Sequence, residues 1–363
     1  MDIEKYLAEK QRHLLKNTSR IRDINVFNFN YIPAKPLMRE EAKPVIDALL
    51  RYQHSGIANN VLILGCRGSG KSVIAKYLMQ ILGNRKQLDF IYVNCRQCNT
   101  SFRILASALG VRPRGVSLDE LWYNFTDLHP QKTVFILDEI DLISNKDKNK
   151  DILYLISRSP NNYMVLLLSN DPKFHQLLDA STQSTLQPEI VHFKSYNALE
   201  LQKILTDRAK IGLGCIPTAI INEIAAMTVK NTNSDVRVAI KTLYQWALEP
   251  GIPIKDHFET ARRDILVDII KDLNDQNLCI LRAASSQHDS YVKSIYGAYR
   301  RISAGLNEEP FSYVHFYSNL SYLQSLGLIL LISTKISKTY TNRIQLAFDP
   351  VVLAAIWSLR FEQ

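Results

Sequence analysis

The sequence has no apolar run near the ~18 residues that a helix needs to span a bilayer. Its first thirty residues are charged and polar, without the apolar stretch of a signal peptide. Internal repeats and low-complexity tracts are also missing. With 46% hydrophobic and 22% charged residues among 363, we expect a cytoplasmic protein of two or three domains, without a membrane partner.

Cysteine is scarce, with five residues scattered along the chain and odd in number. Cys95 and Cys98 have the CxxC spacing of half a zinc site, but no second pair completes it. Free thiols are therefore the favoured interpretation, and a metal site is the less favoured one.

Basic side chains outnumber acidic ones, which gives a net charge of +9 and a pI near 9.2. Residues 31–115 hold 13 basic and 4 acidic side chains, so the excess lies in this part of the chain. Nucleotide phosphates would need only about two or three of these cations. The rest indicate either a polyanionic partner or a solvated basic face, and composition leaves both open.

Short apolar runs rich in Val, Ile and Leu alternate with segments of helical period in the first half of the chain. Strands of this kind, buried on both faces, predict a doubly wound parallel α/β sheet. The expected strands are Asn60–Leu64, Asp89–Asn94, Thr133–Leu137, Tyr163–Ser169 and Glu189–Phe193.

The second half of the chain predicts helices and one hairpin. A capping box opens the first helix at Asn197, with Glu200 three residues later. Three helices near the C-terminus precede two strands, Leu328–Thr334 and Arg343–Phe348, which is a winged-helix layout. We expect a basic leader at 1–22, a nucleotide-binding α/β domain at 23–195, a helical lid at 196–256 and a winged-helix DNA-binding domain at 257–363.

Residues 65–72 read GCRGSGKS and match the phosphate-binding pattern GxxxxGK[ST] between a strand and a helix. Glycines let the backbone approach phosphate, and the helix presents its N-terminal N–H groups to the anion. Lys71 is expected to reach the β- and γ-phosphates of ATP, and Ser72 to ligate Mg²⁺. The residues expected to hold the nucleotide here are Gly65, Cys66, Arg67, Gly68, Ser69, Gly70, Lys71 and Ser72.

Two acidic residues follow the third expected strand, at the edge where a doubly wound sheet binds ligands. Asp138 is expected to hold Mg²⁺, directly or through water, and Glu139 to polarise the attacking water as general base. Asn170 ends the fourth strand and is suited to hold the water or the γ-phosphate. Arg237 opens a lid helix and is suited to bind the γ-phosphate from the lid side.

In this order the motifs resemble the AAA+ ATPases, and within them the archaeal origin-recognition initiators related to the eukaryotic Orc and Cdc loader proteins. The resemblance runs from about Pro36 to the end. Met38-Arg39-Glu40 resembles the box that lines the adenine pocket, which implies that Arg39 is near the nucleotide. Residues 137–141 (LDEID), 169–170 (SN) and 234–237 (SDVR) are similar to the family's Walker B, sensor 1 and sensor 2 motifs.

The resemblance also implies contacts with double-stranded DNA. Residues 101–110 resemble the initiator-specific helix, and residues 310–329 resemble the recognition-helix segment of the winged helix. Side chains in or beside these segments, and in or beside the turn after residue 334, are the expected DNA contacts, against the alternative of a solvated basic face. They are Arg103, Arg112, Arg114, Ser312, Tyr313, His315, Lys335, Lys338 and Arg343.

The sequence departs from the family in two places. Ser181 lies where the family has the arginine finger that a neighbouring subunit uses in hydrolysis. Val314 and His315 occupy positions that often hold basic residues at the start of the recognition helix.

Three functions fit these observations. The first is an archaeal replication initiator that binds origin DNA, uses ATP and ADP as a conformational switch, hydrolyses ATP slowly, and works with sister initiators and the replicative helicase at the nucleoid. The second is a regulatory DNA-binding paralogue in which nucleotide is a structural ligand. The third is an unrelated winged-helix AAA+ switch, against which the initiator-specific segment argues.

Overall fold

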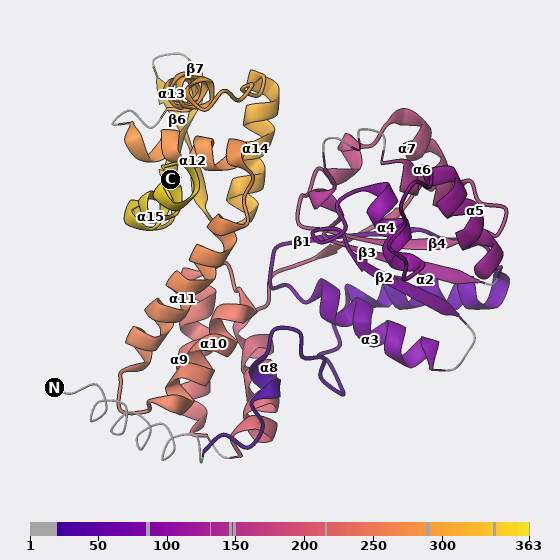
Figure 1. Cartoon of the computed structure of the whole chain (residues 1–363). Helices are drawn as coiled ribbons and strands as arrows, with labels where there is room; N and C mark the ends of the chain where they lie inside the picture. The colour runs from indigo at the N-terminus through magenta and orange to yellow at the C-terminus, as the bar shows by residue number, and fades with distance from the viewer. Residues whose placement is uncertain are drawn as a thin grey trace. The chain divides into compact units, whose positions relative to one another are not determined.

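A computed structural model describes residues 20–84, 88–130, 132–144, 147, 150–214, 216–287, 291–336 and 339–362. The chain forms two compact units (Figure 1). Residues 30–195 make the first unit, and residues 196–363 make the second together with the described part of residues 1–29. The finer division into four parts stays a prediction.

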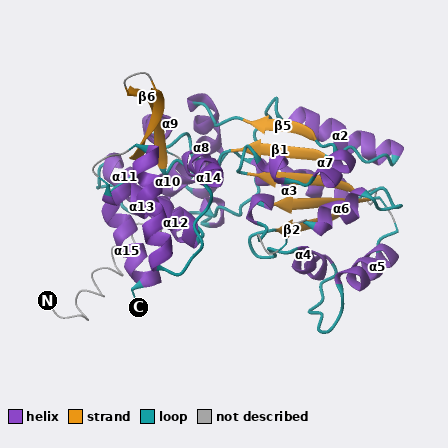
Figure 2. Cartoon of the chain, turned by 90° about the horizontal axis from the view of Figure 1, so that it is seen from above, coloured by secondary structure: helices purple, strands orange, loops and turns teal. Residues whose placement is uncertain are grey.

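The first unit is built on a five-stranded parallel sheet in the order β2-β3-β4-β1-β5 (Figure 2). Its strands are β1 (Val61–Gly65), β2 (Asp89–Asn94), β3 (Thr133–Asp138), β4 (Met164–Ser169) and β5 (Glu189–Phe193). Every residue of β3 and β4 is buried, because helices cover both faces of the sheet. The predicted α/β fold class is confirmed.

Alternate residues of β1 enter two separate cores. Val61 and Ile63 pack in the core that contains residues of α2 and α3. Leu62 and Leu64 pack in the core that contains residues of the helices on the other face. The helices and short 3-10 turns of this unit are α2 (Ala42–Ser55), α3 (Lys71–Gly83), α4 (Ser101–Ala108), α5 (Leu118–Leu128), η2 (Ile140–Leu142), α6 (Asp151–Ser157), η3 (Phe174–Leu177) and α7 (Ala180–Leu186).

The second unit begins with a helical part that also holds an N-terminal segment. The backbone N–H of Arg22 donates to the carbonyl of Gly212 at 2.7 Å, and the Arg208 guanidinium donates to the carbonyl of Val26. The predicted capping box at Asn197 is confirmed. The elements of this part are η1 (Asn25–Phe27), α8 (Ala198–Gly212), α9 (Thr218–Asn231), α10 (Val236–Leu248) and α11 (Ile254–Lys271).

The rest of the second unit is three helices, a hairpin and a last helix around one core. Its elements are α12 (Asp275–Ser286), α13 (Val292–Gly305), α14 (Tyr313–Ser325), β6 (Ile329–Ile336), β7 (Thr339–Leu346) and α15 (Pro350–Phe361). In α14 the expected core positions Phe316, Leu320 and Leu323 are fully buried and Leu326 is nearly so. The prediction shortened both strands of the hairpin, because its polar residues read as a turn, whereas the strands pair from Ile329↔Leu346 to Ile336↔Thr339.

Candidate nucleotide-binding site and nucleic-acid surfaces

The loop between β1 and α3 has the backbone that the GxxxxGK[ST] pattern predicts. Gly68 and Gly70 have φ of 75° and 90°, in the left-handed region that favours glycine. A Cβ at Gly65 would lie 2.5 Å from the carbonyl oxygen of Phe193. The loop therefore needs glycine at these places to wrap an anion with its N–H groups.

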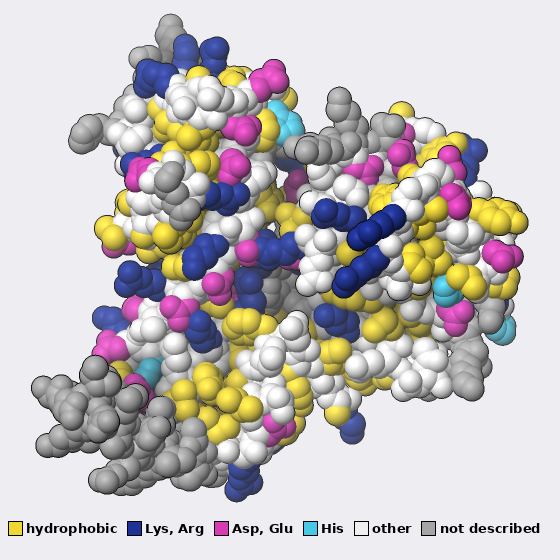
Figure 3. Space-filling view, in the orientation of Figure 1, with side chains coloured by type: hydrophobic (Ala, Val, Ile, Leu, Met, Phe, Trp, Pro, Cys, Tyr) yellow, Lys and Arg dark blue, Asp and Glu magenta, His cyan; other side chains and the backbone are white. Residues whose placement is uncertain are grey.

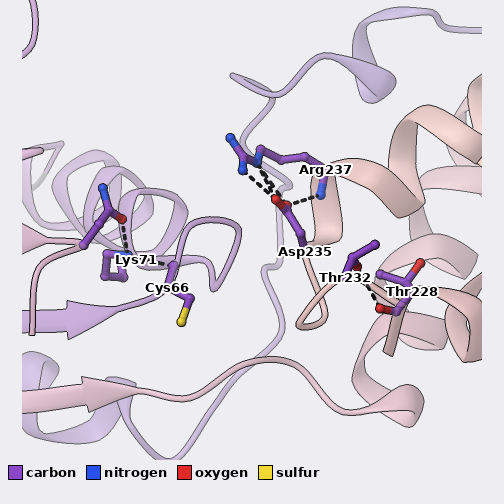
Figure 4. A network of polar contacts seen from close by, with 7 residues as sticks. Cys66, Lys71, Thr228, Thr232, Asp235 and Arg237 are labelled. Atoms are coloured by element: carbon purple, nitrogen blue, oxygen red, sulfur yellow. Dashed lines mark hydrogen bonds and ion pairs between the residues drawn. The ribbon is translucent and has the colours of Figure 1, made fainter. Parts of the chain in front are cut away.

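Lys71 is the first residue of α3 and is only 6% exposed. Its Nζ donates to the carbonyl oxygen of Gly65 at 2.6 Å. It also donates to the carbonyl oxygen of Cys66 at 3.0 Å (Figure 4). The same Nζ donates to Oδ1 of Asn170 at 3.0 Å, so β4 and the loop meet at this ammonium group. Burial lowers the pKa of Lys71 to about 8, although the Asp141 carboxylate opposes the shift.

The carboxylate of Asp138 is held at the end of β3. Oδ2 accepts a hydrogen bond from the Tyr92 hydroxyl at 2.6 Å, and Oδ1 accepts one from the backbone N–H of Glu139 at 3.0 Å. Burial, reinforced by the nearby Asp138 carboxylate, raises the pKa of Tyr92 well above its usual range, so this phenol stays a donor. The contact of Tyr92 was not predicted, because a tyrosine within an apolar strand gives no sign of its partner.

Glu139 lies in the left-handed region at φ 54°, a conformation that costs a non-glycine residue free energy. Its Oε2 accepts a hydrogen bond from Nδ2 of Asn94 at 3.2 Å. Asn94 ends β2 beside Asp138 in the sheet register. The predicted general base is thus held at the carboxyl edge of the sheet by a side chain from the neighbouring strand.

Asp141 is a site residue to which sequence reasoning assigned no role. Its Oδ1 accepts a hydrogen bond from the backbone N–H of Asn170 at 2.9 Å, and burial raises its pKa. Asp141 belongs to η2, the turn directly after Glu139. The carboxylate thereby fixes the end of β4 that offers Asn170 to Lys71.

Arg39 is buried, and its guanidinium contacts the backbone of the phosphate-binding loop. Its Nη1 donates to the carbonyl oxygens of Ser69 and Lys194, both at 3.0 Å. Its Nη2 pairs with Oε1 of Glu41 at 3.1 Å. Described contacts therefore assign Arg39 to bracing the loop against the end of β5, and its predicted contact with nucleotide stays a prediction.

The residues fit a magnesium nucleotide. The buried Oγ of Ser69 has no hydrogen-bond partner among the described residues, which suits a phosphate-binding loop. The Ser72 hydroxyl and the Asp138 carboxylate would hold Mg²⁺, because this cation prefers oxygen ligands. Bound there, the metal would neutralise charge on the β- and γ-phosphates. Cys66 and Arg67 are half-buried in the same loop, and Cys66 is a free thiol.

Arg237 belongs to the second unit, at the start of α10. Its guanidinium pairs with Asp235, with Nη2 to Oδ2 at 2.5 Å and Nε to Oδ1 at 3.0 Å (Figure 4). Asp235 also accepts from the backbone N–H of Arg237, as the N-cap of α10. The pair sets the direction of the Arg237 side chain, while its predicted contact with a γ-phosphate stays a prediction.

Three predicted DNA contacts lie in and after α4. Arg103, Arg112 and Arg114 are all exposed, and Arg103 donates to Oδ1 of Asn99 at 3.2 Å. Figure 3 shows Lys and Arg side chains gathered on the face of the first unit that carries α4. Ser101 fixes the start of this helix, since its backbone N–H and its hydroxyl both donate to Asp147.

The predicted contacts of the winged helix have local partners. The Ser312 hydroxyl caps α14 by accepting from the backbone N–H of His315, whose ring lies 4.4 Å from that of Phe311. Tyr313 is 46% exposed, and Arg343 lies over the ring of Tyr291. Lys335 is exposed near the end of β6, and Lys338 lies outside the described residues. Whether these side chains contact DNA stays a prediction.

The cysteines in the described ranges form no disulfide bond. Cys66, Cys95, Cys98 and Cys279 are free there, and no group of three or more acidic, His or Cys side chains could hold a metal ion. Cys215 lies outside these ranges. No helix among the described residues has the length and apolar character to cross a bilayer.

Comparisons with known proteins agree with this geometry. The model of the AAA domain family matches residues 56–178, which contain the loop and the acidic edge of the sheet. An "ORC1-type DNA replication protein 3" of Sulfurisphaera tokodaii is 28% identical over 318 residues, which cover 81% of each chain. An "ORC1-type DNA replication protein 1" of Sulfolobus acidocaldarius is 34% identical over 232 residues, which cover 59% of this chain and 58% of that protein.

Solved structures show the same fold over almost the whole chain. The Aeropyrum pernix ORC1 protein, solved in complex with DNA, has a TM-score of 0.67 at 22% identity and covers 94% of this chain and 97% of its own. The Aeropyrum pernix ORC2 protein has a TM-score of 0.61 at 21% identity, covering 94% of this chain and 100% of its own.

The sheet order, the phosphate-binding loop and the acidic strand end define an AAA+ protein with a nucleotide-binding site. Within that class, the chain resembles the archaeal ORC1-type DNA replication proteins, the Orc/Cdc type of AAA+ protein. The resemblance stated from the motifs is confirmed.

Proposed function

We propose that this protein is an archaeal DNA replication initiator that binds double-stranded origin DNA under the control of bound nucleotide. One observation carries the proposal: a complete phosphate-binding loop lies in a chain whose similarity to an ORC1-type DNA replication protein covers 81% of both chains. The chain would act in the cytoplasm, at the nucleoid, with sister initiators and the replicative helicase as partners.

The nucleotide part of the proposal uses ATP or ADP with Mg²⁺. Lys71 would neutralise the β- and γ-phosphates, and exchanging its carbonyl partners for phosphate oxygens keeps the ammonium group hydrogen-bonded. Glu139 would accept a proton from the attacking water, and Asn170 would position that water. Arg237, carried by the other unit, would sense the γ-phosphate, so that ATP and ADP favour different arrangements of the units.

The DNA part uses α4 with its following loop, and the winged helix. Arg103, Arg112 and Arg114 are exposed in a part of the chain with a large basic excess, which supports contact with phosphates. The winged helix adds a hairpin that carries Lys335 and Arg343 beside a helix that can enter a groove.

A binding experiment tests the proposal. The protein with ATP and Mg²⁺ is expected to protect origin DNA from its own chromosome against nuclease, with affinity that falls steeply as salt rises. Mapping its chromosomal positions should show occupancy at origins. No protection of origin DNA at any salt concentration would overturn the proposal.

A second function, a regulatory paralogue that keeps nucleotide as a structural ligand, is favoured by one observation. Ser181, exposed on α7, replaces the arginine that the family supplies to a neighbour's site. Loss of an arginine finger can lower hydrolysis by about 10³–10⁵. Promoter-centred occupancy, with turnover that Glu139→Gln does not reduce, would favour this function over the first.

A further inference from the structure

Helix α14 lies in a stretch of the sequence, residues 302–334, that contains no Lys or Arg. The only acidic residues there are Glu308 and Glu309. A helix without cations cannot neutralise phosphates, so it releases no counterions when DNA binds. Whatever α14 contributes to DNA recognition must come from uncharged contacts.

The exposed face of α14 is apolar at its first turn. Val314 is 80% exposed, the largest fraction among the large hydrophobic side chains that the structure describes. Tyr313 and Tyr317 are 46% and 37% exposed, and the spacing of the three places them on one side of the helix. Phe316 and Leu320 face the core, and at 100° per residue Val314 points away from both, so its side chain is not needed to hold the fold.

The two tyrosines are held in place by neighbours. Tyr313 packs edge-on against Tyr296, with ring centroids 5.1 Å apart. The Tyr317 hydroxyl accepts a hydrogen bond from Nδ2 of Asn342 on β7 at 2.5 Å. Val314 therefore projects beside two tyrosines that are each held by a neighbour, which makes it suited to a contact that depends on shape.

Positive charge lies beside these tyrosines, on the hairpin. Asn342 pairs across the hairpin with Ser333, and their side chains share a hydrogen bond at 3.0 Å. Lys335 is two residues beyond Ser333, so it lies on the same face of β6, the face that contacts Tyr317 through Asn342. Figure 3 shows basic side chains gathered at the end of this unit that carries the hairpin. An uncharged helix tip beside a basic hairpin complements a groove lined by phosphates.

We propose that Val314 reads thymine, by packing its methyl groups against the C5-methyl group of thymine in the major groove of double-stranded DNA. The thymine methyl is the apolar group in that groove, whereas the other edges offer donors and acceptors that valine cannot use. N-terminal residues of a recognition helix are those that reach base edges. This inference rests on the proposed function, because it takes DNA as the partner.

The test removes the methyl group from the DNA and the side chain from the protein. One 30-base-pair A·T duplex contains thymine, and a second of the same sequence contains deoxyuridine at every thymine position. The full-length wild-type protein with ATP and Mg²⁺ is expected to bind the thymine duplex about fourfold more tightly, the effect of burying roughly one methyl group. The Val314→Ala variant should bind both duplexes equally, with an unchanged slope of affinity against salt.

The matched control is Val351→Ala on α15, because Val351 is also an exposed valine of this unit, at 65%. This variant should keep the wild-type preference for thymine. Equal affinity of the wild-type protein for both duplexes, or a full preference retained by Val314→Ala, would overturn the inference and leave the proposed function standing. Failure of the wild-type protein to bind either duplex at low salt would instead count against the proposed function, and with it against this inference.

Discussion

Lys71 and Glu139 have different predicted roles. Lys71 would bind phosphate, and Glu139 would activate the attacking water. We expect Lys71→Ala to weaken ATP binding about 10- to 100-fold, because charge-assisted hydrogen bonds are worth ~1.5–3 kcal/mol. Glu139→Gln should keep the affinity and lower turnover by about 10²–10⁴. Calorimetric titration and steady-state phosphate release measure the two effects. Equal losses of affinity in both variants would contradict the separate roles.

The Arg39→Ala variant tests whether the contacts of Arg39 with the phosphate-binding loop stabilise the fold. Arg39→Ala leaves the buried carbonyl group of Ser69 and the partly buried one of Lys194 without their donor, so it should lower the free energy of unfolding by about 2 kcal/mol. The matched control is Lys43→Ala, whose ion pair with Glu40 is exposed and should contribute under ~0.5 kcal/mol. Urea unfolding measures both, and equal midpoints would show that Arg39 is no brace.

At the residue scale, the site residues that could be predicted were those whose role can be recognised from their neighbours in the sequence. The pattern around Lys71 follows from the chemistry of one loop and can be recognised in eight consecutive residues. Asp141 is different, because its partner Asn170 comes from another strand and meets it only after η2 turns the chain. Tyr92 escaped prediction for the same reason, since its contact with Asp138 crosses from β2 to β3.

The contact between α8 and the N-terminal segment makes a prediction at the scale of elements. A Cβ at Gly212 would lie 2.5 Å from Val26 and 2.7 Å from Phe27, so Gly212→Ala should displace the segment and cost ~1–3 kcal/mol. Trypsin should then cut sooner after Arg22. Gly305→Ala is the matched control, because Gly305 also ends a helix and a Cβ there meets nothing within 4 Å. Similar cleavage of the two variants would refute the packing argument.

The elements themselves were largely predictable where apolar periodicity is strong. The strands of the parallel sheet were found within about one residue, because continuous Val, Ile and Leu runs are distinctive. Helix α15 was missed, although Asp349 caps it and Pro350 opens it, because its apolar side chains reach nearly all around the helix and hide its period. The hairpin was shortened because the residues around its tip, 335–342, are polar apart from Ile336 and Tyr340.

The salt dependence of DNA binding is a property of the whole molecule. Replacing Arg103, Arg112 and Arg114 with Ala should lower the slope of log affinity against log salt by about 2–3, since each phosphate contact contributes ~0.9. A control with the same loss of charge replaces Lys203, Lys210 and Lys230, which are exposed on α8 and α9. Its slope should change by less than about 1. Equal changes would mean that net charge, and not the α4 surface, drives binding.

At the scale of the whole molecule, the sequence said least about which distant segments pack together. Residues 20–29 pack against α8, which lies about 180 positions further along the chain. A local sequence pattern does not predict a contact between segments so far apart. The basic excess of residues 31–115 was visible in the composition, but only the fold shows that Arg103, Arg112 and Arg114 are all exposed.

The chain passes between its two units twice, near residue 29 and near residue 195. The first passage begins in a segment already docked on α8, through Arg22 and Arg208. A chain cut between Ser195 and Tyr196 would therefore yield fragments that still share a packed interface within the second unit. Such halves would behave as complementing partners, because the fragment that carries the first unit would keep its N-terminal segment packed on α8 of the other fragment.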